Sequence, residues 1–451
     1  MTIHPPSRML PPGNDDGTSS GDPTSDAPID SVDGVRTSAG PIAMVAAAVF
    51  LLFGVLLHFE AVPHPPTAAY LTALVPIGIL FLLRVEVLKT LTISLPPLLL
   101  VVWIFLSSAW TEDVERTAFL VRLQLPLLIG FMIVGAILSD RDVMKWLLRA
   151  GQFVLAISVA ATIAIPSTRA GALLNGEILE GWHALFPHKN DMGPFLAIFL
   201  GIVIVADKNP WSKWPTLLAT SIMLVGSQSI TGLTSAMVAV AALAWLRANE
   251  RADDRVMSIA VVVTIVIAIA GALGARAGLP IFLEATGKDP TFSGRTDIWA
   301  AVWGAVVDRP ILGYGRGGLF FEPANDISID LWRQIGFRAP HAHNGVLDLT
   351  AQIGVVGLIL FAALFFSTLR GAVHSYRRNE AFGSFVLIFL ATLAVASLSE
   401  PVFLGPYTSV LAMLRIVTIR LDRVAKLREL TDRALPTHLS SKSRSGPRAA
   451  S

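Results

Sequence analysis

A polar stretch that separates two groups of apolar segments decides the fold of this chain. Residues 293–299 read Ser-Gly-Arg-Thr-Asp-Ile-Trp, residues 310–318 read Pro-Ile-Leu-Gly-Tyr-Gly-Arg-Gly-Gly, and residues 341–348 read His-Ala-His-Asn-Gly-Val-Leu-Asp. A basic loop that lies beside a bilayer is therefore the first feature to explain. The side chains that it gathers are Arg295, Arg316, Arg333, Arg338, His341 and His343.

The composition of the chain indicates a polytopic membrane protein. Of its 451 residues, 53% are hydrophobic and only 15% are charged, whereas soluble domains carry about 25% charged residues. The formal net charge of +2 gives no reason to expect a nucleic acid partner. Because the chain has no cysteine, disulfides, zinc–thiolate sites and cysteine nucleophiles are excluded.

Apolar runs of the length that spans a bilayer recur along the chain. A hydrocarbon core of about 30 Å needs roughly 17 to 25 mostly apolar helical residues. The fold class predicted is therefore all-α, a polytopic integral membrane protein with about twelve transmembrane helices and a large extracytoplasmic loop that contains short helices. The candidate spans lie at 41–59, 66–83, 90–109, 118–138, 145–165, 193–206, 215–228, 231–246, 257–275, 344–368, 382–399 and 402–419.

The number of spans depends on residues 214–246. A single helix through them would extend about 50 Å, well past the hydrocarbon, and Gly226-Ser-Gln-Ser-Ile-Thr-Gly232 lies in the middle. Two short segments fit a bilayer better. They also keep Arg247, Arg251 and Arg255 on the cytoplasmic side, where short loops hold most of the Lys and Arg.

The charge distribution assigns each part of the chain to a side of the membrane. With twelve spans, both termini are cytoplasmic and the basic loop is periplasmic. The first forty residues lack a continuous apolar h-region and resemble a solvated tail, so they are interpreted as disordered and not as a cleaved signal. The predicted division is a disordered cytoplasmic tail at 1–40, transmembrane helices within 41–275, a large periplasmic loop at 276–343, transmembrane helices within 344–419, and a basic cytoplasmic tail at 420–451.

Two patterns inside the loop have structural interpretations. Apolar residues between Asp297 and Asp308 recur with helical spacing, so a short helix is expected there. The segment Gly313–Gly318 satisfies G-x-G-x-x-G, but no strand precedes it and nucleotides are not supplied on that side, so a dinucleotide site is excluded. It is either a tight glycine turn or a backbone nest that approaches an anion beside Arg316.

The arginines and histidines of the loop point to anion binding and proton transfer. A diphosphate needs several fixed positive donors, and an arginine grips two oxygens together. Arg295 alone reads as an ordinary interfacial residue, and a loop with several arginines favours anion binding. His343 is either a helix-capping residue or a group that takes a proton from a hydroxyl. No metal is predicted, because no third ligand stands at a fixed short spacing from His341 and His343.

Four motifs together are typical of one family. His343-Asn344 is followed after nine residues by Gly354 and after two more by Gly357. The other three are Gly294-Arg295-x-x-Ile298-Trp299 with Pro310-x-x-Gly313-x-Gly315 in the loop, Ser108-Ala-Trp-Thr111, and His188-Lys-Asn-Asp-Met-Gly193. Across about residues 90–400 the chain resembles the superfamily of O-antigen ligases and Wzy-type polymerases, whose members join lipid-linked glycans outside the cytoplasmic membrane.

The resemblance implies a reaction, its partners and its site. The donor would be a glycan on undecaprenyl diphosphate and the acceptor another glycan, with no cofactor, metal or nucleotide sugar. The protein would lie in the bacterial inner membrane, with a chain-length regulator as a further partner. The family's loop arginine falls on Arg295 and its histidine on His343, which are the predicted catalytic residues. The predicted substrate-binding residues are Arg316, Arg338, Asn344, Lys189 and Trp299.

One position departs from the family pattern. A second family arginine falls on Ile230, so Lys189 or Arg116 is a candidate replacement. This departure favours an exopolysaccharide polymerase of the ExoQ kind. A ligase that transfers the glycan to lipid A core or protein remains the alternative within the superfamily. The alternative from another class is a secondary transporter, whose binding groups would cluster at the bilayer midplane; a structural scaffold would leave the arginine cluster without a function.

Overall fold

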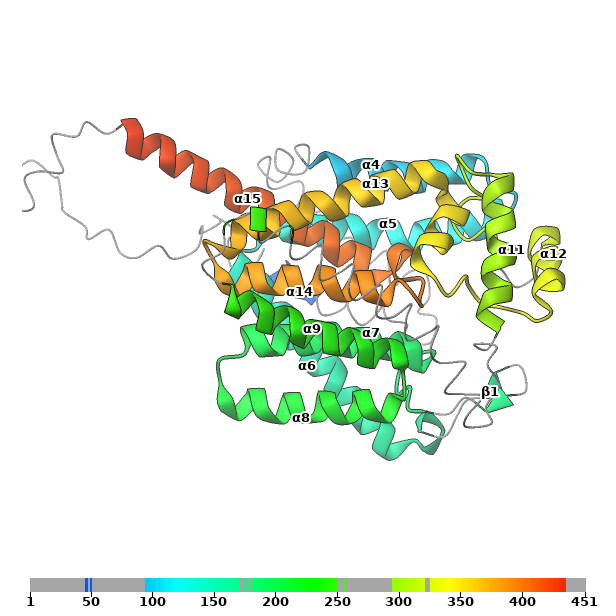
Figure 1. The fold of residues 1–451 in the computed structure, drawn as a ribbon, viewed down its shortest axis with the longest axis horizontal. Coiled ribbons are helices and arrows are strands. Elements are labelled where there is room, and N and C mark those ends of the chain that lie inside the picture. Colours follow the sequence, from blue (N-terminus) through cyan, green and yellow to red (C-terminus); the bar gives the residue numbers. More distant parts are fainter. Residues whose placement is uncertain are drawn as a thin grey trace, which may run out of the picture. The chain divides into compact units, whose positions relative to one another are not determined.

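The computed structural model describes four long parts of the chain and several short ones (Figure 1). The predicted spans at 41–59, 66–83 and 257–275 lie wholly or mostly outside the described residues, as does the tail at 1–40. The long parts are residues 94–169, 181–249, 294–320 and 325–434, and the short ones are 45–47, 49–50, 173–174, 177–178, 253, 255–256 and 259.

Helices make up nearly all of the described residues. Five of them are long and apolar enough to cross a membrane, namely α5 (Val114–Ile137), α6 (Asp140–Ala164), α7 (Lys189–Ala206), α9 (Ile230–Ala248) and α13 (Gly345–Tyr376). The helical membrane fold agrees with the prediction, while the count of about twelve spans and the side of each loop stay predictions. The other α-helices described are α4 (Leu95–Leu106), α8 (Pro210–Ser227), α11 (Arg295–Asp308), α12 (Asp326–Ile335), α14 (Glu380–Ala396) and α15 (Pro406–Ala434). Three short 3₁₀ helices, η1 (Ser107–Ala109), η2 (Pro166–Thr168) and η4 (Val402–Leu404), and the antiparallel pair β1 (Leu173–Leu174) and β2 (Glu177–Ile178) complete the described elements.

The run at 214–246 is broken, as its length predicted. α8 ends at Ser227, and its C-cap Gln228 adopts a left-handed conformation with φ +52°. Ser229 then caps α9, because its side chain accepts a hydrogen bond from the Gly232 amide. The break therefore separates two short helices.

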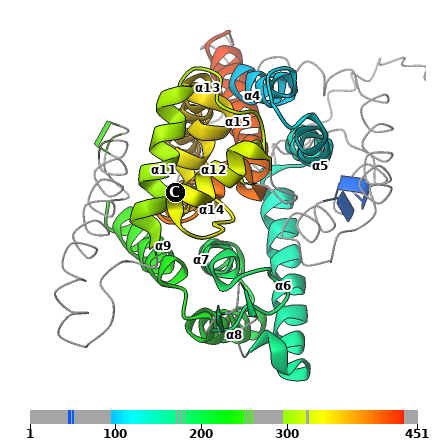
Figure 2. The same cartoon turned by 90° about the vertical axis from the view of Figure 1, so that its right-hand side faces the viewer.

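Helix α14 lies at the centre of the bundle and packs against α7, α9 and α13 (Figure 2). Nearly all of its side chains are buried. Helices α7 and α9 approach each other backbone to backbone, because a Cβ added to Gly232 would overlap the main chain of Gly193. This close contact brings the N-termini of α7 and α9 together.

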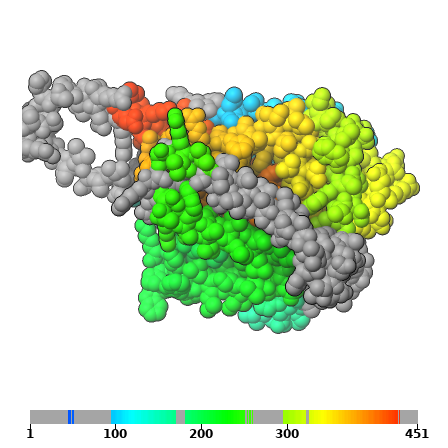
Figure 3. Space-filling model, in the orientation of Figure 1, coloured from blue at the N-terminus to red at the C-terminus, as the bar shows by residue number. Residues whose placement is uncertain are grey.

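Two helices of the loop cross the ends of the bundle. α11 runs across the ends of α13 and its neighbours, and α12 packs against α11 at the same end (Figures 1 and 3). The helix expected between Asp297 and Asp308 is confirmed. Ile298, Val302 and Val306 of the predicted stripe are buried, which fixes α11 on the bundle.

Helix α13 contains a break that the loop completes. Gly354 has φ +70° and ψ 179°, a conformation that is essentially restricted to glycine. The amides of Tyr314 and Gly315 donate to the carbonyls of Ala351 and Gln352 at 2.9 and 2.8 Å. On the other side of the break, the Val355 amide donates to the carbonyl of Pro310, at 2.8 Å.

The loop segment Pro310–Gly315 and the Gly354–Gly357 segment of α13 therefore form one structural unit. A Cβ on Gly354 would overlap the carbonyl of Ile311, so this glycine admits loop backbone and not merely a neighbouring helix. Groups that a broken transmembrane helix leaves unpaired must find partners within the protein, and the loop supplies them. At the C-terminal end, α15 continues as one helix to Ala434, past the boundary predicted at residue 419.

Candidate functional site

The loop that enters α13 holds two histidines in one conformation. Trp299 Nε1 donates to the carbonyl of Ala342 at 3.0 Å, and Asp348 accepts from the Ala342 amide at 3.3 Å. The His343 amide donates to Nδ1 of His341 at 3.2 Å. His343 adopts φ +47°, a conformation that a side chain other than glycine keeps only when its surroundings hold it. The histidine loop is therefore preorganised.

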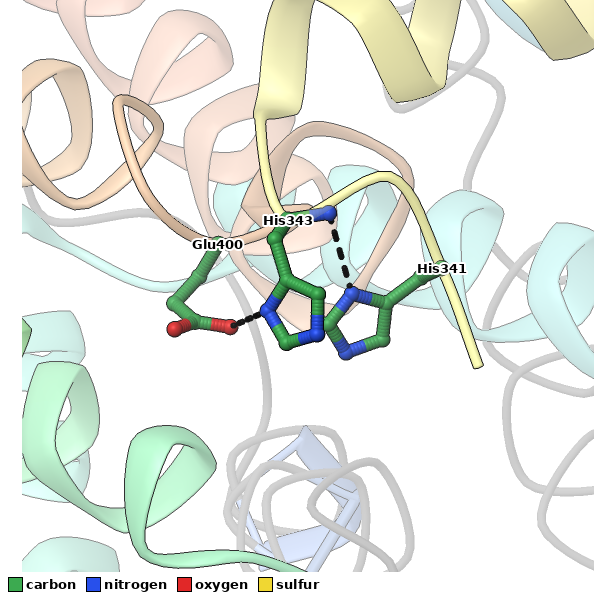
Figure 4. Close-up of side chains that lie close together, drawn as sticks. All are labelled: His341, His343 and Glu400. Atoms are coloured by element: carbon green, nitrogen blue, oxygen red, sulfur yellow. Dashed lines mark hydrogen bonds and ion pairs between the residues drawn. The ribbon is translucent and has the colours of Figure 1, made fainter. Parts of the chain in front are cut away.

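A buried carboxylate joins the two predicted catalytic residues. Glu400 follows α14, and its side chain is only 3% exposed. Its Oε1 lies 3.1 Å from Nη2 of Arg295. Its Oε2 lies 3.5 Å from Nδ1 of His343, the contact drawn in Figure 4. A charged carboxylate at this depth needs a cationic or donor partner. Arg295 and His343, far apart in the chain, thus meet on the two oxygens of one side chain.

Arg295 is the first residue of α11, and part of its side chain faces solvent. Gly294 precedes it with φ +75°, and a Cβ there would overlap the ring of Phe337. The Arg295 side chain is 18% exposed and donates one hydrogen bond, to Glu400. A guanidinium has five N–H donors, so Arg295 retains donors for a ligand.

Two further helices begin beside this cluster. Ser229 Oγ donates to Oδ1 of Asn190 at 3.1 Å, which links the first turns of α9 and α7. Thr231 shares a hydrogen bond of 2.6 Å with Ser399, the residue before Glu400. Helix N-termini carry partial positive charge. The starts of α7, α9, α11 and α13 therefore add to the positive potential of Arg295.

Two other histidines near the cluster are neutral. Burial is the main cause that lowers the pKa of His188 to about 4, and the charges of Lys189, His343 and Arg295 add to it. Burial also lowers the pKa of His341 well below its ordinary value, with smaller effects of His343 and Arg295. In each, Nδ1 accepts a backbone hydrogen bond, so the proton resides on Nε2. These imidazoles are N–H donors at neutral pH.

Arg316 is partly buried, with all three guanidinium nitrogens engaged. Its Nε donates to Gln124 at 2.7 Å, Nη1 donates to Gln352 at 2.6 Å, and Nη2 donates to the carbonyl of Leu404 at 3.1 Å. The Gly317 amide also donates to Gln352. The glycine segment is thus a turn whose amides bond protein acceptors. A substrate contact of Arg316 stays a prediction, and the contacts observed here tie the loop to α5 and α13.

The other predicted substrate-binding residues are dispersed around the cluster. Asn344 caps α13 by accepting from the amides of Val346 and Leu347. Arg338 is exposed and lies over the ring of Trp332. Lys189 begins α7, beside His188. Trp299 uses its Nε1 to hold the histidine loop. Direct contact of these four with substrate stays a prediction.

Ile230, the position where the family pattern has a second arginine, lies at the edge of the site. Ile230 is the first residue of α9, and its side chain is 71% exposed. Of the two candidate replacements, Lys189 begins the helix that contacts α9. Arg116 lies instead on α5, beside the glycine turn. The structure therefore places Lys189, and not Arg116, near the site of the departure.

Glu400 also supplies the third ligand group that the sequence lacked at short spacing. One ligand atom each of His341, His343 and Glu400 lies within 4.8 Å of the others. Arg295, however, already binds Glu400 and brings a fixed positive charge to the same carboxylate. That charge opposes the binding of a cation by electrostatic repulsion. The cluster is thus better suited to a ligand that carries negative charge.

Sequence reasoning missed Glu400 and His188 as site residues. His188 belongs to one of the quoted motifs, and its place directly before an apolar run was the signal. Glu400 stands alone between two apolar runs and carries no motif. An ionisable residue between spans is a functional candidate by default, and that signal was available.

Comparisons with known proteins bear on the same residues. A family model described as O-antigen ligase matches residues 215–362, which include Arg295 and His343. The chain is 26% identical over 262 residues to the exopolysaccharide production protein ExoQ of Rhizobium meliloti, covering 54% of this chain and 60% of ExoQ. It is also 31% identical over 95 residues to a putative polysaccharide ligase of Rickettsia conorii, covering 20% of this chain and 22% of the ligase. A putative polysaccharide ligase of Rickettsia prowazekii is 34% identical over 83 residues, or 18% of this chain and 20% of the ligase.

These similarities confirm the resemblance to the superfamily of O-antigen ligases and Wzy-type polymerases. The chain spans less than two thirds of the length of each of these relatives. Glu400 and His188 both lie outside the matched range of the family model.

Proposed function

We propose that the protein polymerises oligosaccharide repeat units that are linked to undecaprenyl diphosphate, by transferring the growing glycan to a sugar hydroxyl of another lipid-linked unit. The observation that carries the proposal is the meeting of Arg295 and His343 on Glu400. Arg295, which can bind a diphosphate, and His343, which can accept a proton from a hydroxyl, thus lie side by side. The similarity to ExoQ supports the polymerase within the superfamily.

Arg295 acts on the leaving group in this proposal. Negative charge develops on the diphosphate as its bond to the anomeric carbon breaks, and donors already in place stabilise that charge. Arg295 keeps guanidinium donors for this purpose, and the N-termini of α7, α9, α11 and α13 face the same cluster. Lys189, beside His188 at the start of α7, and Arg338 contact other oxygens of the donor in this proposal.

His343 acts on the acceptor. Its Nδ1 faces Glu400, so its Nε2 is available to accept the proton of a sugar hydroxyl. The conformation of the histidine loop keeps this nitrogen in place before substrate arrives. In this proposal the active site is periplasmic, both termini are cytoplasmic, and a chain-length regulator is a further partner.

The test compares variants in a host from which the gene has been deleted. His343→Ala and Arg295→Ala are expected to abolish polymer while the protein accumulates normally in membranes. His374→Ala and Arg333→Ala are matched controls, because His374 is partly exposed, Arg333 is exposed, and each bonds a partner within four residues. Full-length polysaccharide from either site variant at normal protein level would falsify the roles assigned to these residues.

A ligase is the second candidate, because two of the relatives carry that name. The deletion strain distinguishes the two reactions. If single repeat units remain and long chains disappear, the protein is a polymerase. If long chains accumulate on the lipid carrier, it is a ligase, and the same residues act on a different acceptor.

A further inference from the structure

We propose that Glu400 couples donor binding to activation of the acceptor. The inference rests on the proposed function. Before the donor binds, the carboxylate is bonded to Arg295. When the donor diphosphate takes Arg295, the carboxylate shifts its partnership to His343, which is then held ready to receive the proton of the hydroxyl.

The geometry gives Glu400 two partners of unequal strength. Oε1 is within hydrogen-bond distance of Arg295, at 3.1 Å, whereas Oε2 is 3.5 Å from His343. The second distance lies beyond that of a strong hydrogen bond. Consistent with this, Nδ1 of His343 is buried and makes no hydrogen bond within the described part of the chain. In this geometry the carboxylate is therefore engaged mainly by the arginine.

The backbone around Glu400 is fixed, so the carboxylate cannot follow Arg295 away. The Glu400 amide donates to the carbonyl of Ala396 at 3.0 Å, and its carbonyl accepts from Val402 at 2.9 Å. The Gly345 amide donates to the carbonyl of Ser397 at 2.7 Å, which ties this turn to the start of α13. The side chain is left with rotations that keep it between its two partners.

Electrostatic competition predicts that the Glu400 carboxylate shifts from Arg295 to His343 when the donor binds. A diphosphate brings several negative charges to the exposed side of Arg295 and competes with Glu400 for the same guanidinium. A buried carboxylate that loses a partner must gain another. The Nδ1–H of His343 is the nearby donor. Bonding it orients the ring, so that Nε2 faces the acceptor, as a carboxylate does for a catalytic histidine elsewhere.

The transfer step then balances as follows. The acceptor hydroxyl oxygen forms a bond to the anomeric carbon, and the bond between that carbon and the phosphate oxygen breaks. The electron pair leaves on the diphosphate beside Arg295. The hydroxyl proton goes to His343, whose positive charge is balanced by Glu400. Because His343 is engaged only after the donor has bound, an acceptor alone is not activated.

The test uses the full chain in detergent, with undecaprenyl diphosphate as the binding probe. Glu400→Gln removes the charge that competes for Arg295 and keeps the shape of the side chain. Its affinity for the probe is expected to rise by about tenfold, while turnover falls by about a hundredfold. A merely structural glutamate would give the opposite sign for binding, because loosening the site weakens affinity and turnover together.

Three further variants sharpen the result. Asp330→Asn is the matched control, an exposed carboxylate of α12 that pairs only with Arg333, and it should leave binding and turnover unchanged. In an Arg295→Ala background, Glu400→Gln should no longer change probe affinity, because the group for which it competes is gone. Glu400→Asp is the alternative if the glutamine variant does not fold. Its side chain is shorter, so this variant should bind the probe at least as well as the wild type does and should turn over more slowly.

Each outcome is decisive. Equal or weaker probe binding by Glu400→Gln, or weaker binding by Glu400→Asp, would overturn the coupling. If the wild-type protein does not bind the probe at all and His343→Ala retains full polymer, the proposed function fails instead. Wild-type binding with unchanged binding in Glu400→Gln leaves the function standing and removes the coupling.

Discussion

Arg295 and Arg316 come from the same loop but are held in contrasting ways. Arg316 bonds three neutral acceptors with its three nitrogens, and like Arg295 it is partly exposed. Arg295 bonds one charged acceptor, Glu400, and keeps part of its surface open. Burial lowers the pKa of Arg316 to about 10, opposed by the nearby charge of Asp348, so it stays cationic at neutral pH.

The difference lies in how many donors each arginine retains for a ligand. Three neutral acceptors engage three of the five N–H donors of Arg316 and fix its guanidinium, whereas Arg295 uses one donor. A single shared carboxylate leaves donors free, and a second anion can displace it. Motif membership does not make this distinction, because both arginines belong to motifs of the same family resemblance. The hydrogen-bond partners of each side chain determine how many donors it retains for a ligand.

The largest effect is expected at Gly354, where the loop segment that carries Arg316 docks into the break of α13. Gly354→Ala is expected to prevent stable folding or to cost about 3 kcal/mol or more, because the new methyl group overlaps Ile311 and the backbone conformation excludes a side chain. Thermal unfolding of the detergent-solubilised protein measures this loss of stability. Gly304→Ala, in α11 with nothing within 4 Å of the added Cβ, is the control and should be neutral or slightly stabilising. Equal melting temperatures for the two variants would contradict the docking of the loop.

Lysine substitutions at the two arginines should then separate stability from activity. Gln352 keeps its bond from the Gly317 amide, but Arg316→Lys leaves at least one buried acceptor, Gln124 or the carbonyl of Leu404, without a donor. The loss is about 1 to 3 kcal/mol, and the melting temperature should fall. Arg295→Lys retains a cation beside Glu400, so the melting temperature should change little. Its polymer output should fall by about a hundredfold, because one ammonium cannot replace the arginine fork. Matching losses of stability in both variants would erase the distinction drawn between them.

The neutral histidine at the open site predicts how stability changes with pH. The folded pKa of His188 lies below its unfolded value of 6.5, at about 4. Between these values the unfolded chain binds a proton that the folded protein does not, so stability falls as pH drops from about 6.5 to about 4. His188→Asn keeps a capping side chain and should flatten the melting temperature over that window. A variant that retained the full wild-type slope would show that another group is responsible.

Trp299 should give the smallest effect. Trp299→Phe keeps the ring and removes the hydrogen bond to Ala342, which contributes about 1 kcal/mol. Activity should fall several-fold with a small loss of stability, because His343 loses one of the contacts that hold its loop. Trp303→Phe is the control, since Trp303 is exposed on the same helix. Loss of activity in the Trp303 variant alone would place the supporting contact elsewhere.

Local patterns predicted much of the described fold. The apolar runs located the helices, the length of 214–246 predicted the break at Gln228, and the spacing after Asp297 predicted α11. Motifs selected Arg295 and His343, which the structure brings onto one carboxylate. Glu400 was missed because its pairing joins residues 105 positions apart, and no local pattern records such a contact.

The break in α13 was missed for a related reason. Residues 344–368 read as one continuous apolar run, and Gly354 reads as a site of helix packing. Only the tertiary contact with Pro310–Gly315 shows that the helix gives up its own hydrogen bonds there. The alternative uses of Gly313–Gly318 could likewise be resolved only by seeing that Gln352 occupies its amides.

The completed break in α13 has a consequence for biogenesis. Backbone groups that lie unpaired in a lipid environment cost several kcal/mol each, so the N-terminal half of α13, up to the break at Gly354, is not a stable insertion product by itself. Its partner segment precedes it in the chain and is already synthesised when α13 emerges. Helix insertion and loop docking are thus one cooperative event, and a membrane protease that senses unpaired backbone would detect a defective loop through the instability of a transmembrane helix.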